Sequence, residues 1–446
     1  MINYLILILS FFRAEFNFAQ TASLSLQQNS ECLEFLKTLP RDYQRQWIQV
    51  PEDWSQPQGR KIRVFYYTNF IKGQIPVAYF YGGPLGVDHS SYKKFEPLAA
   101  QLNLGFVYID QRGTGCSDAV PVGTDRVSLS RASLYDTSSV VKDAELIREI
   151  FLGKEAKWKV FGQSWGGAIT SRYVYLFPKN LISAHNFAGT ESESTAEFMY
   201  ATMVQQQRVA KIFSQRHPRG MKALQMIKKA IQPDDCYQTQ SHGKICGSLI
   251  YQSLLDSYLG LPELWPQVEI DFIQFIKSNG RVDLAKIFPA IAYIFDFFYS
   301  PSIAATNAVW RQQTRTFHPS GSLAYDCELA YGWLKAQGID RNDLLMDHCM
   351  IVKASYNREW TNILSQVVPA IPQRNLMSIN KMINGLRSNP RLKYYLYSGG
   401  VDIYDRGIFR YEQLKKERQI SYTHFPNSGH FGYYTEARVW QDLVKD

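Results

Sequence analysis

The stretch Gly162-Gln163-Ser164-Trp165-Gly166-Gly167 decides the fold because of what lies on either side of it. The short stretch Trp158–Phe161 precedes it and predicts a strand, and the residues from Trp165 to Phe177 predict a helix. Small residues two positions before and after Ser164 permit a tight, strained turn between strand and helix. Such a turn lifts the serine hydroxyl clear of the backbone, with the N–H groups of the helix start behind it.

Strands and helices alternate on both sides of this turn. Short β-rich runs begin near Gln46, and the clearest strands are Lys61–Phe70, Ile75–Phe80, Gly105–Ile109, Trp158–Phe161, Ala184–Phe187, Leu392–Tyr397 and Ile420–His424. Helices are predicted at Tyr92–Leu102, Asp136–Phe151, Trp165–Phe177 and Thr435–Val444. Strands that alternate with helices at this spacing predict an α/β fold whose mostly parallel central sheet is covered on both faces.

The alternation stops after Gly189 and resumes only near Leu392. The residues in between look mostly helical, rich in aromatics and long polar side chains. We therefore expect a catalytic domain over 23–189 and 388–446, with a large inserted helical cap over 190–387. In open α/β sheets ligands bind at the carboxyl ends of the strands, so an insertion there can act as a lid.

A serine hydroxyl needs a base and an acid to become a nucleophile, and in this fold they follow in the order Ser, Asp, His. His430 lies in a glycine-flanked loop before the final helix, whereas His424 ends the last strand itself. Asp402 lies in the turn after the Leu392–Tyr397 strand, and Asp405 is better placed to cap the following helix. We expect Ser164 as nucleophile, His430 as general base and Asp402 as the acid that orients it.

An oxyanion hole needs two N–H donors. One should be the backbone of Trp165, directly after the nucleophile. The other should come from the loop after the Ile75–Phe80 strand, which reads Tyr81-Gly82-Gly83-Pro84. Consecutive glycines let that backbone approach a substrate oxygen closely, so Gly83 is the expected second donor.

Three motifs in this order resemble the proline iminopeptidase family of α/β-hydrolases: residues 81–84, Asp110-Gln111-Arg112-Gly113-Thr114-Gly115-Cys116-Ser117, and the turn around Ser164. The resemblance covers about 45–190 and 390–446, and Val50–Pro57 is similar to the opening segment of the larger exported members. It implies the α/β-hydrolase fold, the same triad, and oxyanion donors at Gly83 and Trp165. It also implies structural roles for Asp110 and Arg112.

Two residues depart from the family pattern: Tyr81 replaces a histidine, and Leu85 stands where the family has a third glycine. Neither change removes an oxyanion N–H group, but both can reshape the pocket.

The resemblance implies a serine aminopeptidase that releases an N-terminal residue, proline among the candidates, from short peptides through an acyl-enzyme. A carboxylesterase or lipase with the same triad stays open, since the triad does not set the acyl group. A non-catalytic binding protein on this fold is the third hypothesis. An amine substrate calls for an acidic partner, and Glu191, Glu193 and Glu197 are candidates by position alone.

We expect no cofactor and no metal. No cysteine pair has two-residue spacing, and no histidine lies at helical spacing from another. Nucleic acid is also not an expected partner, because 49 Lys and Arg against 40 Asp and Glu give a net charge of only +9, without dense clustering. The densest basic stretch, Arg208–Lys229, carries apolar residues at helical spacing and predicts the solvated face of two helices.

The first twelve residues form an apolar run too short to span a bilayer and typical of a signal peptide, although no lysine or arginine precedes it. We predict a signal peptide over 1–22, cleavage near Ala19 or Ala22, and export, with no stable membrane span elsewhere. Six cysteines agree with an oxidising compartment. Cys236–Cys246 is the best local pair and Cys327–Cys349 the next, and the oligomeric state stays open.

Overall fold

A computed structural model of the chain describes residues 21–83, 89–120, 126–189, 194–238, 244–288, 291, 323–347, 349 and 379–445. Most of the predicted signal peptide, residues 1–20, lies outside the described residues. So do Leu85, Glu191 and Glu193.

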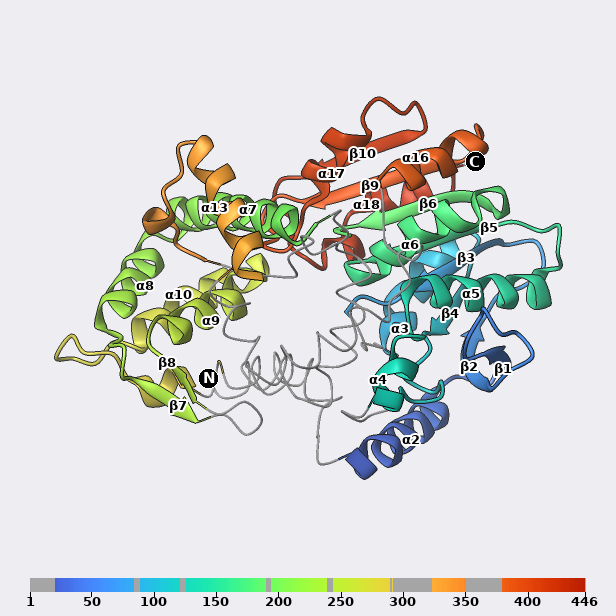
Figure 1. The fold of residues 1–446 in the computed structure, drawn as a ribbon, viewed down its shortest axis with the longest axis horizontal. Coiled ribbons are helices and arrows are strands. Elements are labelled where there is room, and N and C mark those ends of the chain that lie inside the picture. The colour runs from blue at the N-terminus through green and yellow to red at the C-terminus, as the bar shows by residue number, and fades with distance from the viewer. Residues whose placement is uncertain are drawn as a thin grey trace.

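An eight-stranded sheet forms the centre of the catalytic domain (Figure 1). Its order is β1-β2-β4-β3-β5-β6-β9-β10, and the strands are β1 (Gln44–Pro51), β2 (Lys61–Thr68), β3 (Ile75–Phe80), β4 (Leu104–Asp110), β5 (Trp158–Gln163), β6 (Leu181–Phe187), β9 (Lys393–Gly399) and β10 (Ile420–Phe425). Every pair from β4 to β10 is parallel, whereas β1 and β2 join through antiparallel pairs. The mostly parallel sheet is confirmed, and so is an antiparallel strand at Lys61–Thr68.

Helices cover both faces of the sheet. One face packs against α5 (Thr137–Leu152), α6 (Trp165–Leu176) and α16 (Ile379–Ser388), and the other against α2 (Thr21–Thr38), α3 (Ser91–Gln101) and α18 (Ala437–Leu443). The apolar sequence of β3 follows from burial on both faces. Ala78 and Phe80 pack on the side of α5 and α6, while Val77 and Tyr79 pack on the side of α3 and α18. A strand buried on both faces has no polar side, so it reads as continuous apolar sequence.

Between β6 and β9 the chain forms helices with a core of their own. These are α7 (Thr195–Arg216), α8 (Pro218–Ala230), α9 (Ser248–Leu259), α10 (Trp265–Gln274) and α13 (Leu323–Ala336), with a hairpin of β7 (Cys236–Gln238) and β8 (Lys244–Cys246). They gather on one side of the molecule, apart from the sheet (Figure 1). We refer to the chain between β6 and α16 as the insertion.

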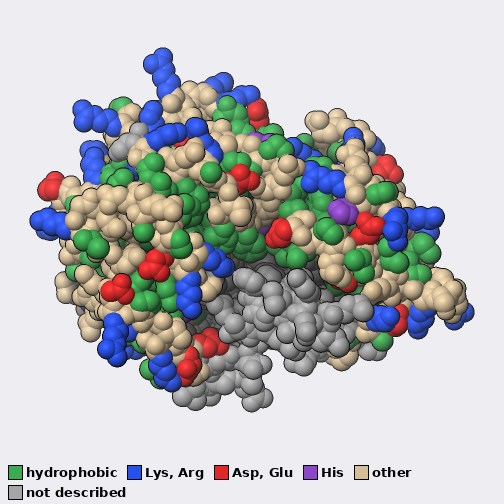
Figure 2. Space-filling view, turned by 180° about the vertical axis from the view of Figure 1, so that it is seen from behind, with side chains coloured by type: hydrophobic (Ala, Val, Ile, Leu, Met, Phe, Trp, Pro, Cys, Tyr) green, Lys and Arg blue, Asp and Glu red, His purple; other side chains and the backbone are tan. Residues whose placement is uncertain are grey.

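The basic stretch Arg208–Lys229 falls on α7 and α8, where Val209, Phe213 and Leu224 are completely buried. Its lysine and arginine side chains are exposed on packed helices, as predicted. On the face that Figure 2 shows, lysine and arginine side chains are dispersed instead of gathering in one patch. None of the helices that the structure describes is long and apolar enough to cross a membrane.

All six cysteines are paired. Cys236–Cys246 closes the β7–β8 hairpin and Cys327–Cys349 lies in the insertion, so both predicted local pairs are formed. The third bridge, Cys32–Cys116, ties α2 to the loop after β4.

The loop after β4 is held by the two residues that the family resemblance marks as structural. The Asp110 carboxylate accepts the Cys116 N–H at 2.7 Å and lies 3.0 Å from the His89 ring. Arg112 is fully buried and forms a two-pronged ion pair with Asp143, at 2.7 and 2.6 Å. Its remaining N–H groups donate to the carbonyls of Pro51, Glu52 and Leu134. Asp110 and Arg112 therefore fix the loop.

Candidate active site

The turn between β5 and α6 holds Ser164 in a backbone conformation that few residues other than glycine adopt, with φ 54° and ψ −116°. Its N–H donates to the carbonyl of Phe187 at the end of β6, at 2.8 Å, and its own carbonyl accepts the N–H of Gly167 at 3.0 Å. Such strain persists only where neighbouring structure enforces it, and it is typical of functional turns.

The glycines around Ser164 are required by close approach. A Cβ atom on Gly162 would collide with the carbonyl of Gly166, and one on Gly166 would collide with the carbonyl of Phe80 at the end of β3. The glycines of the Gly-x-Ser-x-Gly pattern are therefore required because the backbones of β5, β3 and the start of α6 lie in close contact.

The two expected oxyanion donors lie on adjoining backbones. Gly83 follows β3 in a left-handed conformation, φ 74°, and Trp165 is the first residue of α6. A Cβ atom on Gly82 would collide with the side chain of Gln163, so the loop that carries Gly83 lies directly against the elbow that carries Trp165.

Tyr81, which departs from the family pattern, turns into the core. Its hydroxyl lies 2.7 Å from that of Tyr67, and the side chain is almost fully buried. Burial, with Tyr67 beside it, raises the pKa of the Tyr81 hydroxyl well above its usual range. The residue is therefore a neutral core side chain beneath the Gly83 loop.

Asp402 and His430 come together from the two turns after β9 and β10. Nδ1 of His430 lies 2.7 Å from Oδ2 of Asp402, whose side chain is fully buried, and Oδ1 of Asp402 accepts the N–H of Tyr404 at 2.8 Å. With Nδ1–H donating to the carboxylate, Nε2 is left as the basic nitrogen. Nε2 of Gln163, the residue before Ser164, donates to the carbonyl of His430 at 3.0 Å. The structure thus brings the three predicted residues to one edge of the sheet.

The two competing residues have other partners. Asp405 accepts the N–H groups of Gly399 and Gly407, both at 2.5 Å, so it holds the turn after β9 and the first residue of α17 (Gly407–Leu414). Burial and the nearby Asp402 charge raise the pKa of Asp405 well above its usual range. His424 bonds the Ser398 hydroxyl at 2.7 Å, and burial lowers its pKa, as does the charge of Arg208.

Helix α7 contributes contacts that the sequence did not reveal. Gln205 donates to the backbone carbonyl of Asp402 at 2.8 Å, Arg208 lies 3.1 Å from Nε2 of His424, and Arg216 donates to Asn427 at 2.6 Å. The first helix of the insertion is therefore fastened to both turns that carry Asp402 and His430. No sequence motif marks these residues.

An acidic residue of the insertion, Glu263, also lies beside the site. It belongs to a short 3₁₀ turn, η2 (Pro262–Leu264), and a Cβ atom on Gly429, the residue before His430, would collide with the Pro262 ring. The Glu263 side chain is exposed to solvent, yet desolvation by the surrounding protein raises its pKa, and the charge of Asp402 adds to that effect.

Of the three acidic candidates named from the sequence, only Glu197 is described, and its carboxylate accepts a hydrogen bond from Gln413 at 2.5 Å. No sequence motif marks Glu263. Glu263 lies beside the site because η2 packs against the His430 loop, a contact between distant parts of the chain that no local sequence pattern predicts.

A strained serine between β5 and α6, an acid after β9 and a histidine after β10, all on a mostly parallel sheet, define the class of α/β-hydrolases. No protein-family model matches the chain. A proline iminopeptidase of Aeromonas sobria is 30% identical over 316 residues, which cover 65% of this chain and 73% of that protein. The chain belongs to the proline iminopeptidase family.

Other matches include two more proline iminopeptidases. A proline iminopeptidase of Chitinophaga pinensis is 29% identical over 108 residues, or 24% of this chain and 33% of that protein. Among solved structures, the proline iminopeptidase of Mycobacterium smegmatis has 13% identity and a TM-score of 0.38, over 89% of this chain and 97% of that one.

Proposed function

We propose that this chain is a serine aminopeptidase that releases an N-terminal residue, proline first among the candidates, from short peptides. The observation that carries the proposal is the 2.7 Å bond between His430 and Asp402 beside the strained Ser164, in a member of the proline iminopeptidase family. The naming of the related enzymes supports an amide bond to an N-terminal residue as the target.

In this scheme the Ser164 hydroxyl attacks the carbonyl carbon while Nε2 of His430 takes its proton. Asp402 fixes the histidine tautomer and stabilises the imidazolium. The N–H groups of Gly83 and Trp165 stabilise the oxyanion, and His430 then gives its proton to the leaving amine. Water, activated by the same histidine, hydrolyses the acyl-enzyme. The scheme calls for neither a cofactor nor a metal.

Recognition of a free amino terminus requires an anionic partner, since a desolvated ammonium group is costly without one. We assign that role to Glu263. The packing of η2 against the His430 loop supports this assignment, and the charge of Asp402 contributes to the raised pKa of Glu263. With α7 and η2 packed against the triad loops, the insertion would act as a cap that admits short peptides and excludes folded proteins.

A panel of substrates tests the activity. Prolyl and other aminoacyl arylamides should be cleaved, their N-acetylated forms should not, and short acyl esters should be poor substrates. Rapid turnover of esters, with acetylated arylamides cleaved as well as free ones, would favour a carboxylesterase or lipase instead.

Three disulfide bridges also support an oxidising compartment, and we propose that the protein is exported. Intact mass of protein from its native host, with and without reductant, tests this. The mature chain should start near residue 20 and gain mass on reduction, whereas a full-length, fully reduced chain would rule out export.

A further inference from the structure

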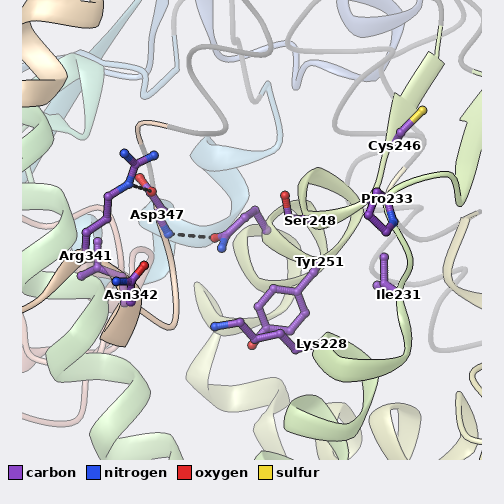
Figure 3. Close-up of a pocket in the computed structure, with 12 residues that line it drawn as sticks. Lys228, Ile231, Pro233, Cys246, Ser248, Tyr251, Arg341, Asn342 and Asp347 are labelled. Carbon is purple, nitrogen blue, oxygen red and sulfur yellow. Dashed lines mark hydrogen bonds and ion pairs between the residues drawn. The ribbon is translucent and has the colours of Figure 1, made fainter.

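A cavity of about 610 Å³ lies within the insertion, between the end of α8, the start of α9 and the turn η3 (Arg341–Asp343) (Figure 3). All of its lining residues belong to the insertion, and the proposed mechanism uses none of them. Two cations and one anion line it: Lys228, Arg341 and Asp347.

The single acid in the lining is already engaged. Asp347 is buried, and its two carboxylate oxygens lie 2.8 and 2.9 Å from the Tyr331 hydroxyl. Arg341 lies 3.5 Å from this carboxylate and stacks over the Tyr331 ring at 4.2 Å. Lys228 lies 5.7 Å from the centre of the Tyr251 ring, and no carboxylate in the described part of the chain pairs with it. The lining, with Lys228 exposed to solvent, therefore carries one more positive than negative charge.

The lining also holds side-chain donors that have no partner in the described structure. Gln252 is only 4% exposed, and its Oε1 accepts the N–H of Asp347 at 2.8 Å, which leaves its amide N–H₂ group as a donor without a partner among the described residues. The hydroxyl of Tyr251, 1% exposed, also has no partner there. Of these two donors, the Tyr251 hydroxyl is the one whose donor atom is fully buried. Buried donors are normally satisfied, so this hydroxyl in the lining indicates a missing acceptor.

Helix α9 begins at the same cavity. Its N-cap is Gly247, in a left-handed conformation with φ 57°, and glycine offers no side chain to the N–H groups of the first turn. Those groups and the helix dipole favour an anion. The Cys236–Cys246 bridge holds the adjoining hairpin, so this wall of the cavity is fixed covalently.

We propose that this cavity binds an anionic group, a carboxylate or a phosphate, through Lys228, Arg341 and Gln252. A carboxylate would come from the C-terminus of a peptide, a source that rests on the proposed function. The far end of α9 meets the triad loops, because Gly260 packs against Ile403 and Tyr404 next to Asp402. Twelve helical residues span about 18 Å, the length of roughly five or six extended peptide residues.

Binding to Ser164→Ala protein, measured by calorimetry, tests the site without cleavage. The probes are inorganic phosphate, a proline-initiated hexapeptide acid and the same hexapeptide as its C-terminal amide. The acid should bind about tenfold more tightly than the amide. Adding Lys228→Gln and Arg341→Gln should remove that difference, and Lys229→Gln, an exposed neighbour on α8 outside the lining, should keep it.

Phosphate binding that the double substitution abolishes, with acid and amide equal, would uphold the anion site and assign it to a free anion. Equal acid and amide binding together with no phosphate binding would overturn the proposal. Cleavage of a prolyl arylamide, which is too short to reach the cavity, should be unchanged by the double substitution in protein that keeps Ser164. If no aminoacyl arylamide is cleaved while the acid still binds, the proposed function fails and the cavity assignment stands.

Discussion

The sheet and the insertion hold their functional residues in different ways. Ser164 is held by backbone contacts: its N–H donates to the Phe187 carbonyl, and Gly166 lets the end of β3 approach closely. Gln205 and Glu263 reach the same site only because α7 and η2 dock on the turns after β9 and β10. Backbone geometry thus positions the proposed nucleophile, while side-chain docking supports the turns that carry Asp402 and His430. Substitutions in the sheet should therefore cost far more activity than those in the insertion.

Among the substitutions that compare the two regions, the largest effect is expected at Asp402. Asp402→Asn should lower kcat by about a thousandfold or more, because an amide can favour the wrong tautomer of His430. Asp405→Asn should instead lower the free energy of unfolding by about 1–3 kcal/mol, since the amide keeps only one of two acceptors for Gly399 and Gly407. Rates per folded molecule and denaturant unfolding separate the two, and the reverse ranking would move the catalytic acid to Asp405.

Much of the sheet could be predicted because its pattern is local. Parallel strands buried on both faces read as apolar runs, and the strained turn at Ser164 demands small residues at fixed positions. The glycine-flanked loop of His430 and the turn of Asp402 follow predicted strands directly. Chain order and fold were therefore enough to predict that Ser164, Asp402 and His430 lie at one edge of the sheet.

The rest depended on docking. Gln205 is one of three consecutive glutamines on α7, and only the packed structure shows that it is the one that reaches Asp402. Glu263 lies in a single turn of 3₁₀ helix with no motif. The Cys32–Cys116 bridge joins residues 84 apart, a separation that no local rule could select.

An intermediate effect is expected at Glu263. Glu263→Gln should raise KM for free-amine substrates about tenfold or more and leave kcat nearly unchanged, since it removes a charge partner of the amine. Because the pKa of Glu263 is raised, wild-type KM should rise as pH falls through that raised pKa, where the carboxylate takes up a proton. The variant should lack this rise. Glu197→Gln, whose partner is Gln413, serves as the control and should keep the wild-type KM.

The smallest effect compares two neighbours on α7. Gln205→Leu removes the bond to the Asp402 carbonyl and should lower kcat by about two- to tenfold, with KM unchanged. Gln206 is completely buried, and neither its amide oxygen nor its nitrogen has a partner in the described structure. Gln206→Leu should therefore keep kcat and match or exceed the wild-type Tm. Equal losses of kcat in both variants would mean that α7 supports the fold without positioning Asp402.

The turnover of a prolyl arylamide by Ser164→Ala protein tests the central claim most directly. The substitution removes only the hydroxyl from the turn between β5 and α6, so Tm and the circular dichroism spectrum should match those of the wild type. We predict that kcat/KM falls by about a thousandfold or more, as for other serine triads. A folded variant that retains more than about a tenth of the wild-type activity would contradict the assignment of Ser164 as the nucleophile.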